Sequence, residues 1–204
     1  MSRTTKKRHD GQNKDSIRTF VCIEIPDSIK QRLEDLENQL RRVDAQVSWV
    51  KPSNVHLTLK FLGGVPVDRI DSVAEAAERA SRGARVFDIE VGGAGCFPSP
   101  RNPRVFWVGL TALPEDLVRL HGRLEAELEP LGFEREARRF APHLTIGRLR
   151  SPGTGAELAR TLIDIGFEPQ RFVARDLIVM RSQLKPTGSI YTPIKTIPLL
   201  STQQ

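Results

Sequence analysis

The tetrapeptide His56-Leu57-Thr58-Leu59 returns later in the chain as His143-Leu144-Thr145-Ile146. If each tetrapeptide is a strand, alternate side chains share a face, so the histidine and threonine point one way and the two aliphatic residues point the other. Burying the aliphatic side leaves the imidazole and the hydroxyl on the open side, about 6 to 7 Å apart along the strand. Two such strands side by side would present matching hydrogen-bonding groups to one tetrahedral anion. The fold therefore has to bury one side of both strands and bring their other sides together.

Paired histidines suit acid-base chemistry, because an unperturbed pKa of about 6.5 lets one ring accept a proton while the other donates one near neutral pH. Metal binding is the first alternative, but a catalytic zinc site needs three protein ligands, and neither tetrapeptide has an acidic or sulfur neighbour. A serine or cysteine nucleophile is a further alternative, but the sequence has no GxSxG motif and no cysteine near either histidine. We expect a metal-free site that depends on His56 and His143.

Hydrophobic periodicity and turn residues predict a mixture of strands and helices. Apolar positions three or four residues apart predict helices over 27–42, 68–81, 114–131 and 155–165. Runs rich in β-branched residues predict strands over 17–25, 47–50, 55–62, 86–92, 104–110, 143–149, 170–181 and 190–198. We expect Gly63-Gly64 to end the third strand and 93–103 to form a loop. Short hairpin-like links predict an α+β fold with antiparallel sheets, in one domain of two lobes over 17–204.

Most of the net charge of +6 lies at the N-terminus, where the first 18 residues hold six basic and two acidic side chains. This composition predicts a flexible basic arm over 1–16, which suits a polyanionic partner; a solvated tail without a partner is the alternative. The apolar runs are shorter than the roughly 20 residues of a membrane span. No apolar segment follows the basic N-terminus as in a secretory signal. We expect a cytoplasmic protein that does not contact a membrane, with Cys22 and Cys96 in its core.

Two HxTx motifs with these flanks resemble the two-histidine (2H) phosphoesterase superfamily, and specifically its RNA 2′,3′-cyclic phosphodiesterase branch, once described as 2′-5′ RNA ligases. The resemblance covers nearly the whole chain after the arm. It extends beyond the tetrapeptides to segments 18–23, 54–63, 104–107 and 142–148, to Arg181-Ser182, and to Gly188 and Tyr191.

The resemblance implies a bilobal α+β fold of two antiparallel sheets flanked by helices, with the HxTx strands lining a central cleft and no metal or cofactor. It implies hydrolysis of a terminal RNA 2′,3′-cyclic phosphate to a 2′-phosphate, with 2′-5′ ligation as the reverse reaction. His56 would donate a proton to the leaving oxygen, and His143 would accept one from water. Thr58 and Thr145 would bind the phosphate oxygens.

Three further residues are candidate substrate contacts by the same resemblance: Arg148, Arg181 and Tyr191. Arg148 shares the face of His143 only if Gly147 introduces a bulge. Tyr191 could stack on a terminal base, with a packed strand tyrosine as the alternative. Arg181 would border the cleft.

Other side chains are expected to have structural or solvated positions. Lys60 shares the face of His56 by strict alternation, and a solvated lysine is the favoured interpretation. Phe61 falls on the leucine face, and we assign it to the core together with Trp49 and Trp107. His121 is expected to be exposed on its helix.

Two other functions remain open at this point. The substrate could be a small cyclic phosphate instead of RNA, or the chain could bind RNA ends without chemistry. The expected partner is RNA with a 2′,3′-cyclic phosphate end, tRNA fragments included, and the expected state is a monomer. The sequence has no glycine-rich nucleotide-binding motif, so we expect no requirement for ATP or GTP.

Overall fold

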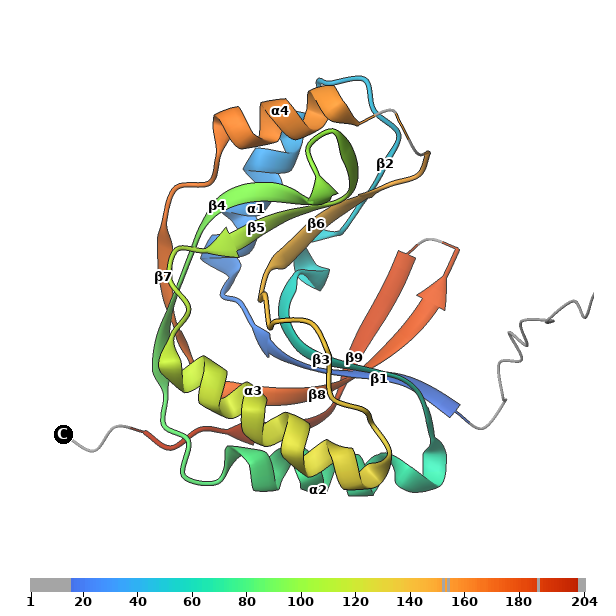
Figure 1. The fold of residues 1–204 in the computed structure, drawn as a ribbon, viewed down its shortest axis with the longest axis vertical. Coiled ribbons are helices and arrows are strands. Elements are labelled where there is room, and N and C mark those ends of the chain that lie inside the picture. The colour runs from blue at the N-terminus through green and yellow to red at the C-terminus, as the bar shows by residue number, and fades with distance from the viewer. Residues whose placement is uncertain (1–15, 152, 154, 187, 202–204) are drawn as a thin grey trace, which may run out of the picture.

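The computed structural model describes residues 16–151, 153, 155–186 and 188–201. These residues form two antiparallel sheets and four α-helices (Figure 1). The first sheet has the order β3-β1-β8-β9 and the second has the order β2-β6-β5-β4-β7. The predicted α+β class is therefore confirmed. The strands of the first sheet are β1 (Ser16–Glu24), β3 (His56–Pro66), β8 (Asp176–Lys185) and β9 (Gly188–Pro198), and those of the second are β2 (Val47–Trp49), β4 (Phe87–Ser99), β5 (Asn102–Leu110), β6 (Leu144–Leu149) and β7 (Gln170–Ala174).

Each sheet is covered by helices on one side only (Figure 1). Helices α2 (Ile70–Ser81) and α3 (Glu115–Leu128) pack on each other and against the first sheet, while α1 (Asp27–Leu40) and α4 (Ala156–Ile165) lie on the second. The buried positions of α1 include Ile29, Leu33, Leu36 and Leu40, which keep the predicted helical spacing. Short 3-10 turns, η1 (Pro52–Asn54), η2 (Val67–Arg69) and η3 (Glu129–Leu131), complete the connections. We call the other side of each sheet its helix-free face.

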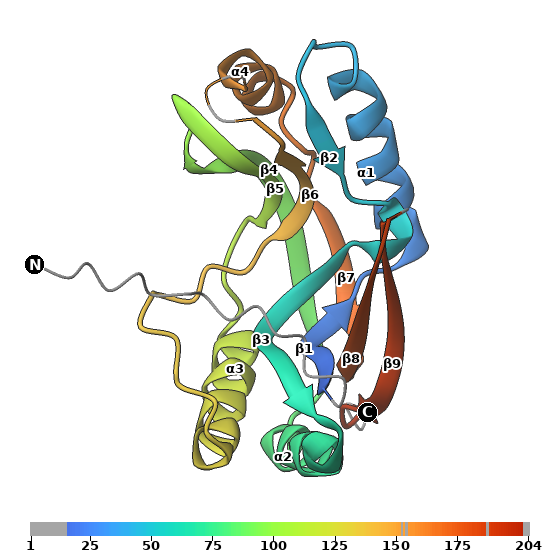
Figure 2. The same cartoon turned by 90° about the vertical axis from the view of Figure 1, so that its right-hand side faces the viewer.

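The β8–β9 hairpin extends beyond the first sheet towards the second (Figure 2). In that view the hairpin reaches the turn η1 below α1, where the Asn54 side-chain amide donates a hydrogen bond to the Ser189 carbonyl at 2.7 Å. This bond ties the residues that precede His56 to β9.

Glycine positions explain where the predicted strand limits were wrong. β3 continues through Gly63, which has φ +70° and pairs with Thr19 beside a register shift, so glycine here permits a bulge instead of ending the strand. The predicted loop 93–103 is mostly strand, because β4 and β5 form one long hairpin. Gly93, with φ +64°, again lies at a register shift.

The predicted strand 170–181 is two strands in different sheets. β7 pairs with β4 in the second sheet, whereas β8 pairs with β1 and β9 in the first. The chain crosses between the sheets at Arg175. The apolar residues Phe172–Ala174 and Leu177–Met180 are separated by only two charged residues, so hydrophobicity alone does not reveal the crossing.

The predicted arm lies outside the described residues except for Ser16, which begins β1. Its division from one following domain stays a prediction. In the part of the chain that is described, no helix is both long and apolar enough to span a membrane.

Lys60 forms a buried ion pair, contrary to the expectation that it is solvated or faces the open side. Thr58 pairs with Cys22 and Lys60 pairs with Val21, so Leu59 is an extra residue that turns Lys60 towards the helices. The Lys60 ammonium lies 2.7 Å from one carboxylate oxygen of Glu125 on α3, and both side chains are at most 6% exposed.

The same ion pair holds the segment that leads to His143. The Lys60 ammonium also donates to the Glu134 carbonyl at 2.6 Å, and the Glu125 carboxylate accepts the backbone N–H of Glu136 at 3.1 Å. His121 also belongs to this cluster, so the prediction that it is exposed was wrong. Its ring stacks on Phe140 with 3.8 Å between centroids, and its Nε2 atom lies 3.6 Å from a carboxylate oxygen of Glu125.

Replacing Glu125 with glutamine should destabilise the protein by about 3 to 5 kcal/mol, because the Lys60 charge would remain buried without its counter-ion. Urea unfolding at pH 7 measures this change. Glu115→Gln is the matched control on the same helix, since it breaks an exposed pair with Arg119 and should cost less than about 1 kcal/mol. Equal effects of the two substitutions would contradict the structural role of the pair.

Candidate active site

The first HxTx motif begins β3, and the second starts at His143, one residue before β6. The two strands belong to different sheets. The two strands approach each other within 8 Å between Cα atoms. A short segment of chain links the edge of β6 to the start of β3. Val50, just after β2, donates its backbone N–H to the Ile146 carbonyl at 2.9 Å, and β3 begins after the single turn η1. The fold therefore brings together the two strands whose open sides were predicted to meet.

His56 is held in one orientation by its backbone and by two aromatic rings. Its Nδ1 atom lies 2.8 Å from the Asn54 carbonyl. Its ring stacks on Phe20 with 4.5 Å between centroids, and the edge of Tyr191 meets it at 5.2 Å. In the neutral ring a proton on Nδ1 makes the bond to Asn54, so Nε2 is left as the proton acceptor. Burial lowers the pKa of His56 to about 4, although the Asn54 carbonyl acts in the opposite direction.

His143 has an equivalent setting in the second sheet. Its Nδ1 atom lies 2.8 Å from the Ala141 carbonyl, again two residues earlier in the chain. Phe97 meets the ring at 5.1 Å and Trp107 lies 6.4 Å away, between centroids. Burial lowers the pKa of His143, the Ala141 carbonyl raises it, and the positive charge of Arg148 lowers it. Both imidazoles are therefore held through Nδ1 with Nε2 free of that bond.

A β-bulge follows the threonine in both motifs. Thr145 pairs with Trp107 and Gly147 pairs with Phe106, so Ile146 is the extra residue, as Leu59 is in β3. After each bulge, the side chains that strict alternation places on the helix side lie on the helix-free face, and the reverse. The residue at the second position after the bulge then returns to the helix-free face, which is Phe61 in β3 and Arg148 in β6.

The bulge decides the position of Arg148. The sequence required a bulge for Arg148 to share the face of His143, and the structure has one, but at Ile146 instead of Gly147. Arg148 pairs with Val105 and so lies on the same face as Thr145. Gly147 lies on the helix side, where a Cβ atom would come within 2.8 Å of Val47.

Tyr191 and Arg181 are placed differently with respect to His56. Tyr191 lies beside His56 and Phe20, and it pairs with Ser182 on β8. Arg181 alternates with Met180 and Ser182 along β8, so its side chain projects from the opposite face of the first sheet. The structure therefore brings Tyr191 to the motif, but not Arg181.

Aromatic residues beside the histidines were missed or misassigned from the sequence. Phe61 is 57% exposed and not in the core, because the bulge moves it to the helix-free face. Trp107 is half-buried beside His143, and its indole N–H has no hydrogen-bond partner among the described residues. Phe20 and Phe97 come from β1 and β4, far from either motif in the sequence. No local pattern marks these positions, because each contact crosses between strands.

Metal-ligating side chains do not gather here. Within the described ranges, no three His, Cys, Asp or Glu side chains are placed to share a metal ion. The absence of a metal requirement stays a prediction.

Comparison with known proteins gives a consistent family. The LigT-like phosphoesterase family matches the chain twice, over residues 23–107 and 108–191. Each match contains one HxTx motif. The RNA 2′,3′-cyclic phosphodiesterase of Methanothermobacter thermautotrophicus is 33% identical over 90% of this chain and 99% of that relative. The relative of the same name from Thermotoga maritima is 35% identical over 86% of this chain and 91% of its own length.

Solved structures share the fold. The crystal structure of TT0787 of Thermus thermophilus superposes with a TM-score of 0.76 and 25% identity, over 92% of this chain and all of that one. The crystal structure of E. coli LigT complexed with 3′-AMP gives a TM-score of 0.71 at 23% identity, over 90% of this chain and 98% of that one. By the double match, the paired motifs and the shared fold, the chain belongs to the LigT-like phosphoesterase family.

Proposed function

We propose that this protein hydrolyses the 2′,3′-cyclic phosphate at the 3′ end of RNA to a 2′-phosphate. The observation that carries this proposal is the matched pair of imidazoles, each bonded through Nδ1 to the carbonyl two residues earlier, at the starts of two strands that approach each other. Two proton-transfer groups on two converging strands suit a reaction in which one oxygen attacks phosphorus and another leaves. The names of the two relatives at 33% and 35% identity support the RNA substrate.

His143 accepts a proton from the attacking water at Nε2. The water oxygen forms the new bond to phosphorus and the bond from phosphorus to the 3′ oxygen breaks. His56 donates its Nε2 proton to that leaving oxygen, which becomes the 3′-hydroxyl. Thr58 and Thr145 donate hydrogen bonds to the remaining phosphate oxygens, and these bonds strengthen as negative charge develops. Exchange of one proton with solvent restores both rings.

His56 must become protonated when the substrate binds, because only the protonated ring can donate a proton to the leaving oxygen. Burial holds the pKa of His56 at about 4 in the free protein, so the ring is neutral at pH 7. An anionic phosphate beside the ring favours its protonated form and raises that pKa. The assignment of donor and base follows the family resemblance, because the two settings are nearly equivalent. Ligation would use the same two rings, with an RNA 5′-hydroxyl in place of the attacking water.

The experiments below also distinguish two other functions: hydrolysis of a small cyclic phosphate, and binding of RNA ends without chemistry. A small cyclic phosphate would need the same two histidines but no RNA contacts beyond the reacting nucleotide. A module that only binds RNA ends would not need them as proton-transfer groups.

Removing either imidazole should lower kcat by about 100- to 10,000-fold on an RNA with a 2′,3′-cyclic phosphate end. A substrate with sulfur in place of the 3′ oxygen separates the two roles, because a thiolate leaves without a proton. His56→Ala should recover most of its rate on this analogue, whereas His143→Ala should not. Recovery by His143→Ala alone would show that the roles are exchanged, and unchanged rates with the natural substrate would contradict the proposal.

The titration of His56 should depend on the phosphate. In the free protein its pKa should lie near 4 by NMR, so the unfolded chain binds one more proton than the folded one between about pH 6.5 and pH 4. Stability should therefore fall as the pH is lowered through this range. Adding a nucleotide 2′-phosphate, the product type, should raise the pKa of His56. A pKa near 6.5 without ligand, or no change on binding, would contradict the proposed electrostatics.

A further inference from the structure

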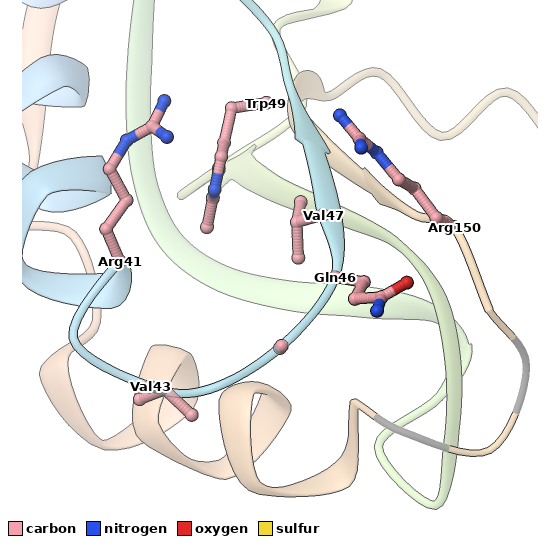
Figure 3. A pocket seen from close by; sticks show the side chains of 7 residues that line it. Arg41, Val43, Gln46, Val47, Trp49 and Arg150 are labelled. Atoms are coloured by element: carbon pink, nitrogen blue, oxygen red, sulfur yellow. The ribbon is translucent and has the colours of Figure 1, made fainter.

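A cavity of about 490 Å³ lies at the β2 edge of the second sheet (Figure 3), and none of its lining residues belongs to an HxTx motif. β2 is one of the two edge strands of this sheet. The residues that line the cavity are Arg41 after α1, Val43, Ala45 and Gln46 before β2, Val47 and Trp49 in β2, and Arg150 just after β6. We call it the β2 pocket. Nothing in the proposed hydrolysis uses these residues.

The β2 pocket combines an aromatic plane with two guanidinium groups. The Arg41 guanidinium carbon lies 5.2 Å from the centre of the Trp49 ring. In Figure 3 the indole of Trp49 stands between the side chains of Arg41 and Val47, and β2 runs between the indole and Arg150. No acidic side chain lines the pocket among the described residues. A flat apolar surface beside arginines is the combination that binds the bases and phosphates of single-stranded nucleic acid.

The two arginines are only weakly neutralised. The Arg41 guanidinium lies 3.4 Å from a carboxylate oxygen of Glu37. Burial raises the pKa of Glu37 to about 7, although the positive charge of Arg41 acts in the opposite direction. Arg150 donates through Nε to the Ser48 hydroxyl at 3.0 Å, an uncharged partner. The pocket therefore offers positive charge to an anionic ligand.

A row of polar side chains on the helix-free face runs from the HxTx motif of β6 to Arg150 at the rim of the β2 pocket. Trp49 lies on the other side of β2, beside Gly147 on the helix side, so a chain that follows the row enters the pocket by passing round the edge strand at Arg150. Ser48 pairs with Arg148, which lies on the face of Thr145, and Arg150 contacts Ser48. Five residues of strand separate Thr145 from Arg150, roughly 16 Å. A nucleotide held at Thr145 does not itself reach this far, so an occupant of both sites needs more than one nucleotide.

We propose that the β2 pocket is a subsite for an upstream nucleotide of the RNA whose 3′ end reacts. Trp49 stacks on its base, and Arg41 and Arg150 contact phosphates. The inference rests on the proposed function and adds to it a preference for RNA chains over mononucleotides.

The test compares a ten-nucleotide single-stranded RNA ending in a 2′,3′-cyclic phosphate with cytidine 2′,3′-cyclic phosphate. The double variant Arg41→Gln, Arg150→Gln should lower kcat/KM on the RNA about tenfold and leave the mononucleotide rate within twofold. Arg42→Gln is the matched control, because Arg42 is exposed next to Arg41 and does not line the pocket. Trp49→Leu should also lower the RNA rate about tenfold by loss of stacking, with thermal unfolding as the check that it folds.

Binding of the same RNA with a 3′-hydroxyl end tests the pocket without turnover. By fluorescence anisotropy, the double variant should reduce the slope of log affinity against log salt by about 1.4, because each phosphate that is no longer neutralised accounts for about 0.7. If the wild type hydrolyses both substrates and the double variant matches Arg42→Gln in rate and slope, the subsite is wrong and the proposed function stands. If the folded wild type hydrolyses neither substrate, the proposed function is wrong, and the salt slope alone decides the subsite.

Discussion

One buried ion pair fixes the two halves of the site relative to each other. Lys60 directly follows the first HxTx motif, and its partner Glu125 lies on α3. The two charged groups also bond to the backbone of Glu134 and Glu136, in the irregular segment that leads to His143. Removing two charges from water is costly unless their remaining hydrogen-bonding groups are satisfied. The pair therefore holds the first motif, α3 and the approach to the second motif in one arrangement.

Local symmetry around the histidines follows from similar sequence placed in two sheets. Each ring bonds to the carbonyl two residues earlier, each packs beside two aromatic side chains, and each motif ends in a bulge. The differences lie after the bulges. The first sheet presents Phe61 on the helix-free face, where the second presents Arg148. One side of the site is therefore more apolar, and the charged side continues along β6 towards the β2 pocket.

The sequence was sufficient to predict the four helices and most strands, because these depend on spacing within one segment. The approach of the two motif strands was predicted differently, from the repeat of the tetrapeptide. The sequence was insufficient where contacts between strands decide the outcome. Strict alternation gave the wrong face for Lys60 and Phe61, since a bulge depends on the partner strand. The crossing at Arg175 has no turn signal, because the apolar residues at the end of β7 and near the start of β8 are separated only by Arg175 and Asp176. The ring that stacks on His56, Phe20, comes from a neighbouring strand for the same reason.

The central claim is that the two imidazoles act directly on a cyclic phosphate. The most direct measurement is product analysis after incubating the protein with a short RNA 2′,3′-cyclic phosphate in EDTA. Our account predicts a terminal 2′-phosphate with a free 3′-hydroxyl, formed at the same rate with and without EDTA. A 3′-phosphate product, a rate abolished by EDTA, or no product from folded protein that binds the RNA would contradict it.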